Sequence, residues 1–321
     1  MPFVSQTFQQ QVASAAEALK ASLRGRQAPA YYLHFAGQYL LPGLFDDTPE
    51  TIPLAQLSSE VSSMPNLDGQ EPAVLWGCCD KVPVMVATGI RRTVEGCGML
   101  EALFPTVLAE QVGVRNHIFL DTAISLQSEW KAGQWGMLSD FINGYAVSPL
   151  EGLQGMLEHS FPNLSEVFSQ VQNSEIINAL AAVGDAPKLC TYYGVPGFHL
   201  PSMAEARMIR EQGADFLGHD LVLHVILSYA MGCRVSALAL AGGQILPGMS
   251  PHFTRQELTE TEHFCSRQLC QGLRTAIRSL HDSAEGYVEN VLPDADADEL
   301  IRASIQRSAT RSSPLKAFLR K

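Results

Sequence analysis

Residues 190–220, CTYYGVPGFHLPSMAEARMIREQGADFLGHD, contain the side chains that are best placed to bind a ligand. The stretch reads as strand, loop, helix and strand, and its loop at 197–202 follows a strand, where α/β proteins bind their ligands. The ionisable side chain of the loop is His199, which fits either a pocket or an ordinary surface position. Ser202 and Glu205 match the S-x-x-E capping box, so we assign Glu205 to the start of the helix rather than to chemistry.

The cysteines and histidines do not have the spacing of metal ligands. The seven cysteines include no CxxC pair, and the nine histidines include no HExxH motif. His219 and His224 are five residues apart, which does not place them on one face of a helix. We therefore expect reduced, mostly buried thiols, no metal and no cofactor.

The composition excludes several classes of partner. A chain of 321 residues with 46% hydrophobic residues can bury a large core. Its formal charge of −11 argues against a nucleic-acid or anionic-membrane partner. The first residues lack a basic segment followed by an apolar run, and no apolar stretch has the length that spans a bilayer. We therefore expect a cytoplasmic protein with no membrane partner.

Strands alternate with helices along the chain, which predicts an α/β fold. The runs AVLWGCC and VPVMVATG, joined by Asp80 and Lys81, indicate a β-hairpin, so the sheet should be mixed rather than purely parallel. A second capping box, Thr254 and Glu257, begins a long helix. The other expected elements are helices at 5–24 and 97–112 and strands at 31–35, 117–121, 136–143, 188–195 and 233–241.

The end of the chain differs in character from the rest. An acidic segment, DADADEL, is followed by a basic and serine-rich one from residue 302 to residue 321. This pattern fits either a solvated helix with a frayed tail or a segment that docks on a partner. We divide the chain into an α/β domain at 1–292 and an extension at 293–321, partly helical or disordered.

Four stretches, in order along the chain, resemble motifs of the trimeric purine nucleoside phosphorylases. They are TGIRRTVEG (88–96), GQWGMLSDFIN (133–143), SFPNLSEVF (160–168) and the run from CTYYGVPGF to LALAGGQ (190–244). The resemblance implies a single α/β domain, in which helices surround a twisted mixed β-sheet with a distorted barrel. It also implies a nucleoside-like ligand and a homotrimer with sites near the subunit interfaces.

The resemblance places the phosphate-binding loop of that family on FAGQY. Ala36 falls near the family's serine, and Gly37 is the one loop glycine that remains. The arginine and histidine of the next motif fall on Ile90 and Arg92. Arg91 and Arg92 keep positive charge nearby, but alternation along a strand would point only one of them into the pocket.

Two acidic residues fall on further phosphate positions of the family. The family's Asn-Ala-Ala segment corresponds to Asp121, Thr122 and Ala123, and its serine corresponds to Asp220. Two ionised carboxylates that line the cradle of a dianion would oppose binding by several kcal/mol. Phosphate is therefore a doubtful partner of this chain.

The family's purine contacts are also replaced. Its glutamate falls on Pro201, which has neither an ionisable group nor an N–H, and its asparagine falls on Gly243. A methionine and a histidine beside the sugar correspond to His219 and Thr261. The remaining candidates for ligand contact are Gly197, His199, Leu200 and Gly218.

Two hypotheses follow from this pattern. The first is a purine nucleoside phosphorylase-like protein that binds a nucleoside or nucleobase and has lost ordinary phosphorolysis, and so acts as a pseudoenzyme. The second is an active pentosyltransferase or N-glycosidase in which Asp121, His219 and Asp220 form an acid/base set that activates water. A structural alternative for Asp220 is that it caps the helix that begins there, with His219 buried behind it.

Overall fold

The computed structural model describes residues 3–23, 27–59, 61, 63–151, 153–159, 161–197, 199–248 and 253–286. Residues Met1–His281 group into one compact unit, and the architecture below is that of this unit. The predicted extension at 293–321 lies outside the described residues. Among the helices that the described residues form, none is long and apolar enough to cross a membrane.

Strands and helices alternate through the described residues. The strands are β1 (Tyr31–Ala36), β2 (Glu50–Pro53), β3 (Ala73–Cys79), β4 (Val82–Thr88), β5 (Asn116–Ser125), β6 (Trp135–Asn143), β7 (Lys188–Gly194), β8 (Phe216–Gly218) and β9 (Arg234–Gln244). The helices are α1 (Phe3–Ser22), α2 (Leu54–Leu57), α3 (Met99–Gln111), α4 (Gln170–Val183), α5 (Met203–Glu211), α6 (Leu221–Ala230) and α7 (Arg255–Gly286). Short 3₁₀ helices occur at Thr93–Glu95, Gln154–Met156 and Leu164–Glu166.

The strands form one mixed sheet in the order β2-β3-β4-β1-β5-β8-β7-β6-β9. β1 pairs in parallel with β4 and β5, whereas β3 and β4 are antiparallel. β9 also pairs in parallel with β5, which closes β5, β8, β7, β6 and β9 into a barrel. A register shift at Ala123/Ile124 marks a bulge, the device by which a strand bends as a sheet closes. The predicted α/β fold, with a mixed sheet and a distorted barrel, is confirmed.

The hairpin between β3 and β4 turns on Asp80 and Lys81, as predicted. Their φ angles are 49° and 69°, the left-handed values that a two-residue type I′ turn requires. The Asp46 carboxylate accepts both of their main-chain N–H groups, at 3.0 and 2.8 Å. The short β2 and α2 are missed by the sequence pattern because four-residue elements are too short to show a hydrophobic period.

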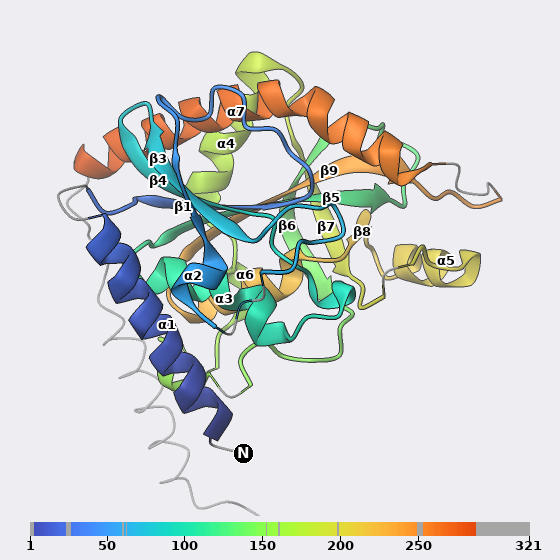
Figure 1. Cartoon of the computed structure of the whole chain (residues 1–321). Coiled ribbons are helices and arrows are strands. Elements are labelled where there is room, and N and C mark those ends of the chain that lie inside the picture. Colours follow the sequence, from blue (N-terminus) through green and yellow to red (C-terminus); the bar gives the residue numbers. More distant parts are fainter. Residues whose placement is uncertain are drawn as a thin grey trace, which may run out of the picture. The chain divides into compact units, whose positions relative to one another are not determined.

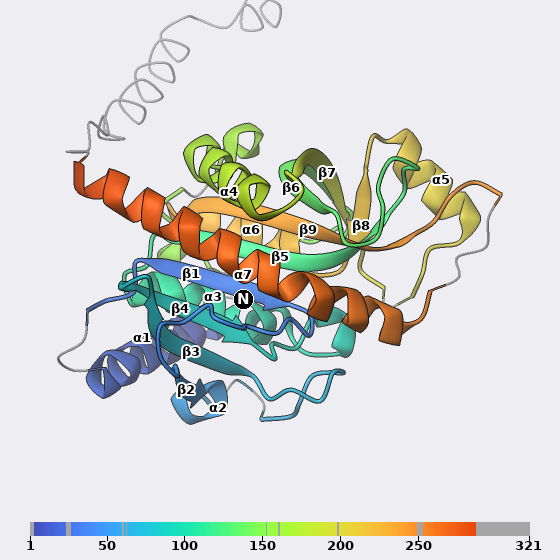
Figure 2. The same cartoon turned by 90° about the horizontal axis from the view of Figure 1, so that it is seen from above.

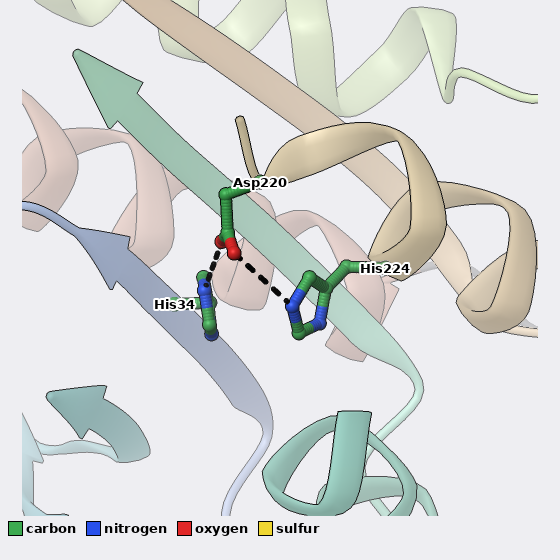
Figure 3. A group of neighbouring side chains, drawn as sticks. All are labelled: His34, Asp220 and His224. Carbon is green, nitrogen blue, oxygen red and sulfur yellow. Dashed lines mark hydrogen bonds and ion pairs between the residues drawn. The ribbon is translucent and has the colours of Figure 1, made fainter. Parts of the chain in front are cut away.

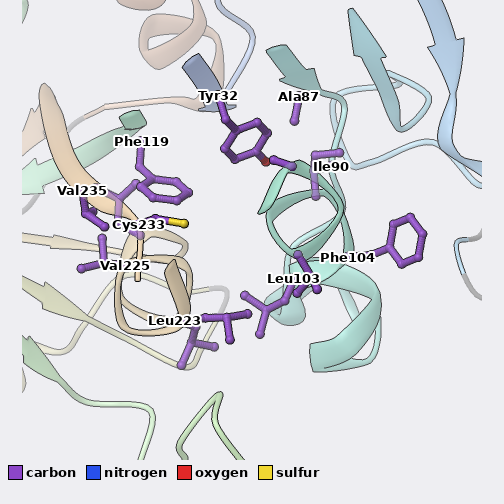
Figure 4. Packing of buried hydrophobic residues seen from close by; sticks show 14 of the residues in the cluster. Tyr32, Ala87, Ile90, Leu103, Phe104, Phe119, Leu223, Val225, Cys233 and Val235 are labelled. Carbon is purple, nitrogen blue, oxygen red and sulfur yellow. The ribbon is translucent and has the colours of Figure 1, made fainter. Parts of the chain in front are cut away.

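Side chains of β1 alternate between two hydrophobic cores. Tyr31, Leu33 and Phe35 pack with α4 and α7 on one face of the sheet. Tyr32 packs in the core that α1, α3 and α6 cover on the other face. Figures 1 and 2 show these helices, and Figure 4 shows Tyr32 with side chains of α3 and α6. The two-residue repeat of a strand puts His34 on the same side as Tyr32, so β1 carries a histidine into this second core.

Two helices begin at the predicted capping boxes. Ser202 accepts the N–H of Glu205 at 3.3 Å, and the Glu205 carboxylate accepts the N–H of Ser202 at 2.7 Å. Thr254 and Glu257 make the same reciprocal pair, at 3.2 and 2.6 Å. The starts of α5 and α7 are therefore set by local hydrogen bonds, which place the loops before both helices.

Candidate functional site

A cavity of about 330 Å³ lies where the carboxyl ends of β1, β5 and β8 meet the first turns of α7. The loops after α2, β4 and β7 complete its wall. The lining residues are Ala36, Gly37, Asp68, Arg92, Thr122, Ile124, His199, Leu200, Leu217, Gly218, His219, Phe253, Arg255, Leu258, Thr259 and Glu262. A space of this size, with apolar walls and a few polar groups, is typical of a small-molecule site.

Many of the residues predicted from the sequence gather at this cavity, although they come from separate segments. Those that line it are Ala36, Gly37, Arg92, Thr122, His199, Leu200, Gly218 and His219. Those that do not line it are Arg91, Asp121, Ala123, Gly197, Asp220, Gly243 and Thr261.

The two neighbouring arginines point in different directions, as predicted, but for a different reason. Arg92 lines the cavity, whereas Arg91 donates to the Glu101 carboxylate at 3.4 Å and to the Glu95 carbonyl at 3.2 Å. β4 ends at Thr88, so both arginines belong to a loop and strand alternation does not apply. Their ion-pair partners orient them instead.

Two of the predicted glycines support residues that line the cavity. A Cβ at Gly243 would lie 2.8 Å from the ring of Phe253, and one at Gly197 would overlap the ring of His199. Thr261 donates its hydroxyl to a main-chain carbonyl of its own helix at 2.8 Å. The α7 residues that line the cavity are at 255, 258, 259 and 262, which share a helical face that excludes position 261.

Asp121 lies beneath the floor of the cavity and is 2% exposed. Its Oδ2 accepts the hydroxyl of Tyr192 at 2.5 Å. A Cβ at Gly218 would overlap this hydroxyl and lie 2.6 Å from Asp121 Oδ2, so the floor closes over the pair only with glycine at 218. Burial, with the neighbouring Asp220, raises the pKa of Asp121 to about 7.

Asp220 lies beside this pair and contacts two histidines (Figure 3). Its Oδ2 lies 2.6 Å from His34 Nε2, and its Oδ1 lies 3.6 Å from His224 Nε2. Burial opposes ionisation of Asp220, but the two imidazoles outweigh it and lower its pKa well below the usual range. The expectation that Asp220 caps α6 is wrong, because its side chain makes no cap hydrogen bond and points to the histidines.

The acid/base set predicted from the sequence is therefore not assembled at the cavity. His219 lines it, and burial with the nearby Arg92 lowers the pKa of His219 to about 4, so its imidazole is neutral at pH 7. Asp121 and Asp220 are buried below the floor, which also corrects the expectation that two aspartates line a phosphate cradle. The chain folds them inward because each has a polar partner there.

A different carboxylate, that of Glu262, lies at the end of the cavity next to the loop that follows β1. Its Oε2 accepts the main-chain N–H of Gln38 at 2.7 Å. A Cβ at Gly37 would lie 2.7 Å from its Oε1, so the absence of a side chain at 37 makes room for the carboxylate. Burial raises the pKa of Glu262, while hydrogen bonds from Thr122 and Gln38 act in the opposite direction. α7 is thereby joined to the loop after β1.

The charges on the cavity wall balance. Arg92 donates to Glu95 at 2.7 Å and lies 3.9 Å from Asp68, and Arg255 also binds Asp68. Gln38 donates to the same aspartate at 2.9 Å. Two arginines and two carboxylates, Asp68 and Glu262, therefore line the cavity, and their formal charges sum to zero.

Several lining residues escape sequence reasoning. Asp68 lies in a turn-rich segment whose few apolar residues have no regular spacing, so nothing in the sequence indicates that it reaches the cavity. Arg255, Leu258 and Glu262 follow the capping box at Thr254, which places the helix but does not show which face meets β1. The i, i+3, i+4, i+7 spacing of Arg255, Leu258, Thr259 and Glu262 is the signal that could have identified them.

Comparisons with known proteins agree on one relationship. A sequence profile of the phosphorylase superfamily matches residues 74–278. The chain is 23% identical over 225 residues to purine nucleoside phosphorylase 1 of Geobacillus stearothermophilus, over 69% of this chain and 82% of that protein. It is 27% identical over 199 residues to purine nucleoside phosphorylase 1 of Bacillus subtilis, over 60% and 73%. Its fold is similar to the Schistosoma mansoni purine nucleoside phosphorylase in complex with inosine, with a TM-score of 0.74, 18% identity, and coverage of 84% of this chain and 95% of that one.

Proposed function

The chain belongs to the phosphorylase superfamily, and we propose that it binds a nucleoside- or nucleobase-like small molecule in the cavity without ordinary phosphorolysis. Solved structures of similar fold are complexes with inosine, hypoxanthine and adenosine. The cavity combines the ring of Phe253 and the side chain of Leu258 with polar groups such as Thr122 and His219. A planar base joined to a hydroxyl-bearing sugar requires this combination of apolar and polar contacts.

The observation that carries the proposed loss of phosphorolysis is the position of Glu262. In the purine nucleoside phosphorylases that this sequence resembles, main-chain amides of the loop after the first strand hold phosphate. In this chain the Gln38 amide of that loop donates to the Glu262 carboxylate at 2.7 Å. An anion that is part of the protein therefore takes a donor that phosphate would need.

The charge balance of the cavity supports the same proposal. A phosphate dianion needs excess positive charge or free donors to offset the loss of its hydration. Arg92 binds Glu95, and Arg255 binds Asp68, so both guanidinium groups that line the cavity already have carboxylate partners. A neutral ligand, such as a nucleoside or a free base, does not need excess positive charge in the cavity.

The proposal is tested by incubating the purified chain with inosine, guanosine and adenosine, with and without phosphate. Free base is measured by chromatography, and binding is measured by calorimetry. We expect binding of at least one nucleoside or its base and no phosphate-dependent release of base. Release that rises with phosphate concentration would contradict the loss of phosphorolysis, and a lack of binding across the panel would contradict the ligand class.

A second function, hydrolysis of an N-glycosidic bond, has one observation in its favour. Glu262 is a carboxylate on the cavity wall whose pKa is raised by burial, which suits a group that takes a proton from water. In this reading Glu262 replaces the acid/base set of Asp121, His219 and Asp220. Base release that needs no phosphate and is lost in Glu262→Gln would favour hydrolysis over binding alone.

The assembly, the cellular location and the domain boundary are part of the same proposal. We take the protein to be a cytoplasmic homotrimer with an α/β domain at 1–292 and an extension at 293–321. Large exposed apolar side chains, among them Phe161 at 99% and Phe264 at 86%, are consistent with self-association. Light scattering on the full chain measures the number of subunits.

A further inference from the structure

A cluster of three ligand-type side chains lies in the second core, below the cavity. One ring nitrogen of His34, one ring nitrogen of His224 and one carboxylate oxygen of Asp220 all lie within 4.8 Å of one another. His34 comes from β1, whereas Asp220 precedes the first residue of α6 and His224 lies one turn further along. All three side chains are at least 95% buried, and Figure 3 shows both imidazoles turned toward the carboxylate.

Both imidazoles are held in this orientation by hydroxyl groups on their far sides. His34 Nδ1 lies 3.2 Å from the hydroxyl of Tyr32, and His224 Nδ1 lies 2.7 Å from the hydroxyl of Thr106. The two hydroxyls are themselves 3.5 Å apart. Histidines that bind a metal through Nε2 have this second contact at Nδ1, which fixes the ring and its tautomer.

An aromatic ring lies against both imidazoles, and the carboxylate beside them is buried. The ring of Phe119 lies 5.8 Å from His34 and 5.7 Å from His224, measured between centroids. An ionised carboxylate in such a place requires a counter-charge.

We propose that His34, Asp220 and His224 form a binding site for a divalent transition-metal ion of the zinc class. Two imidazole nitrogens and one carboxylate, completed by solvent, are a ligand set that zinc adopts. Donors at about 2.0–2.1 Å from a tetrahedral ion are about 3.4 Å apart. His224 and Asp220, at 3.6 Å, already have this separation, whereas His34 and Asp220, at 2.6 Å, must move apart by less than 1 Å.

When the ion binds Nε2 of an imidazole, the proton of that ring can be carried on Nδ1, where a hydroxyl already lies. In the bound tautomer each imidazole carries its proton on Nδ1 and donates it to the hydroxyl of Tyr32 or of Thr106. The direct hydrogen bond between His34 and Asp220 is replaced by two bonds to the ion. The ion would then link β1, whose last residue Ala36 lines the cavity, to the start of α6, and the residues just before Asp220, Gly218 and His219, also line the cavity.

The experiment uses the full chain after treatment with a chelator. Cobalt(II) is titrated into the protein, and visible d–d bands report a four-coordinate site with nitrogen and oxygen ligands. We expect roughly one ion per chain, displacement of cobalt by zinc, and a higher melting temperature with zinc. Asp220→Asn should weaken cobalt binding at least tenfold. His117→Gln is the matched control, because His117 is a buried histidine of the same core that binds Ser228 at 2.9 Å.

Two results would overturn the proposal. One is the absence of d–d bands and of a zinc-dependent rise in melting temperature in the wild-type chain, a measurement that does not depend on whether a variant folds. The other is binding that is lost equally in Asp220→Asn and His117→Gln, or in neither. None of these results depends on which ligand occupies the cavity, so the metal site and the proposed function can fail separately.

Discussion

Replacement of Glu262 by alanine should allow free phosphate to bind the hydrogen-bond donors that the Glu262 carboxylate occupies in the wild-type chain. The carboxylate of Glu262 accepts the N–H of Gln38 at 2.7 Å, and Thr122 also donates to it. Alanine removes this internal anion and leaves the donors facing the cavity. Free phosphate can then bind where the side chain lay, while the wild-type chain should be insensitive to phosphate at matched ionic strength.

The size of the effect follows from two opposing contributions. Loss of a hydrogen bond to a charged group costs about 1.5–3 kcal/mol of stability in phosphate-free buffer. A phosphate site with a dissociation constant of about 1 mM, in about 100 mM phosphate, restores about 2.7 kcal/mol. In a domain of this size that is a rise of about 5–10 °C in melting temperature, since each kcal/mol shifts it by about 2–4 °C.

The assay is thermal unfolding of wild type and Glu262→Ala in phosphate and in chloride of equal ionic strength. Glu260→Ala is the matched control, because Glu260 lies on the same helix, is exposed and accepts a hydrogen bond from Gln256 at 2.8 Å. It changes the net charge equally and should gain nothing specific from phosphate. The reasoning fails if phosphate stabilises wild type as much as Glu262→Ala, or if it stabilises Glu262→Ala no more than Glu260→Ala.

Three further predictions concern the floor and the wall of the cavity. Gly218→Ala should lower the free energy of unfolding, measured in urea, by about 1–3 kcal/mol, because the new Cβ overlaps the hydroxyl of Tyr192 that binds Asp121. Gly98→Ala is the control, because a Cβ there meets open space, and it should change the free energy of unfolding by less than about 1 kcal/mol. Equal losses in the two variants would refute this. The pKa of Asp121 is about 7 in the folded protein and 3.8 in the unfolded chain, so the folded state binds the proton more tightly. Up to about 4 kcal/mol of folding stability is therefore lost as the pH rises from about 4 to 7. Asp121→Asn should remove this loss, and parallel profiles of stability against pH for the two proteins would contradict the assignment. Phe253→Ala should weaken nucleoside binding about 10- to 100-fold in calorimetry, while Phe264→Ala, on the exposed side of α7, should leave it unchanged; equal affinities would exclude Phe253 from the site.

Most of the fold can be predicted from the sequence because its elements carry strong local signals. The turn at Asp80 and Lys81 and the capping boxes at Ser202 and Thr254 are determined by nearest neighbours, and the structure confirms them. Closure of the barrel by pairing of β5 with β9 is not a local property. It follows here from resemblance to a family, because the pairing joins strands more than a hundred residues apart.

The site was less predictable because its contacts cross the sheet. Alignment identifies positions such as Arg92 and His219 that do reach the cavity, but it carries no information on where a replaced side chain turns. Asp220 stands where the family has a phosphate-binding serine, yet it turns to His34, a residue 186 positions earlier that no spacing rule connects with it. Both partners look unremarkable in the sequence, one in an apolar strand and the other before a helix.

The proposed loss of a phosphate site rests on two separate residues, Glu262 and Asp220, and this limits what a single substitution can achieve. Glu262→Ala frees the amide of Gln38, but Asp220 stays bound to its histidines below the floor and offers no hydroxyl to the anion. The resemblance places the family's two polar contacts to the base on Pro201 and Gly243, and neither carries a polar side chain. Catalysis of phosphorolysis requires the anion, the sugar and the base to be held together, because the rate comes from positioning and electrostatics. Glu262→Ala should therefore bind phosphate and still release no base from inosine, and phosphorolysis by this variant would show that Glu262 alone had suppressed the reaction.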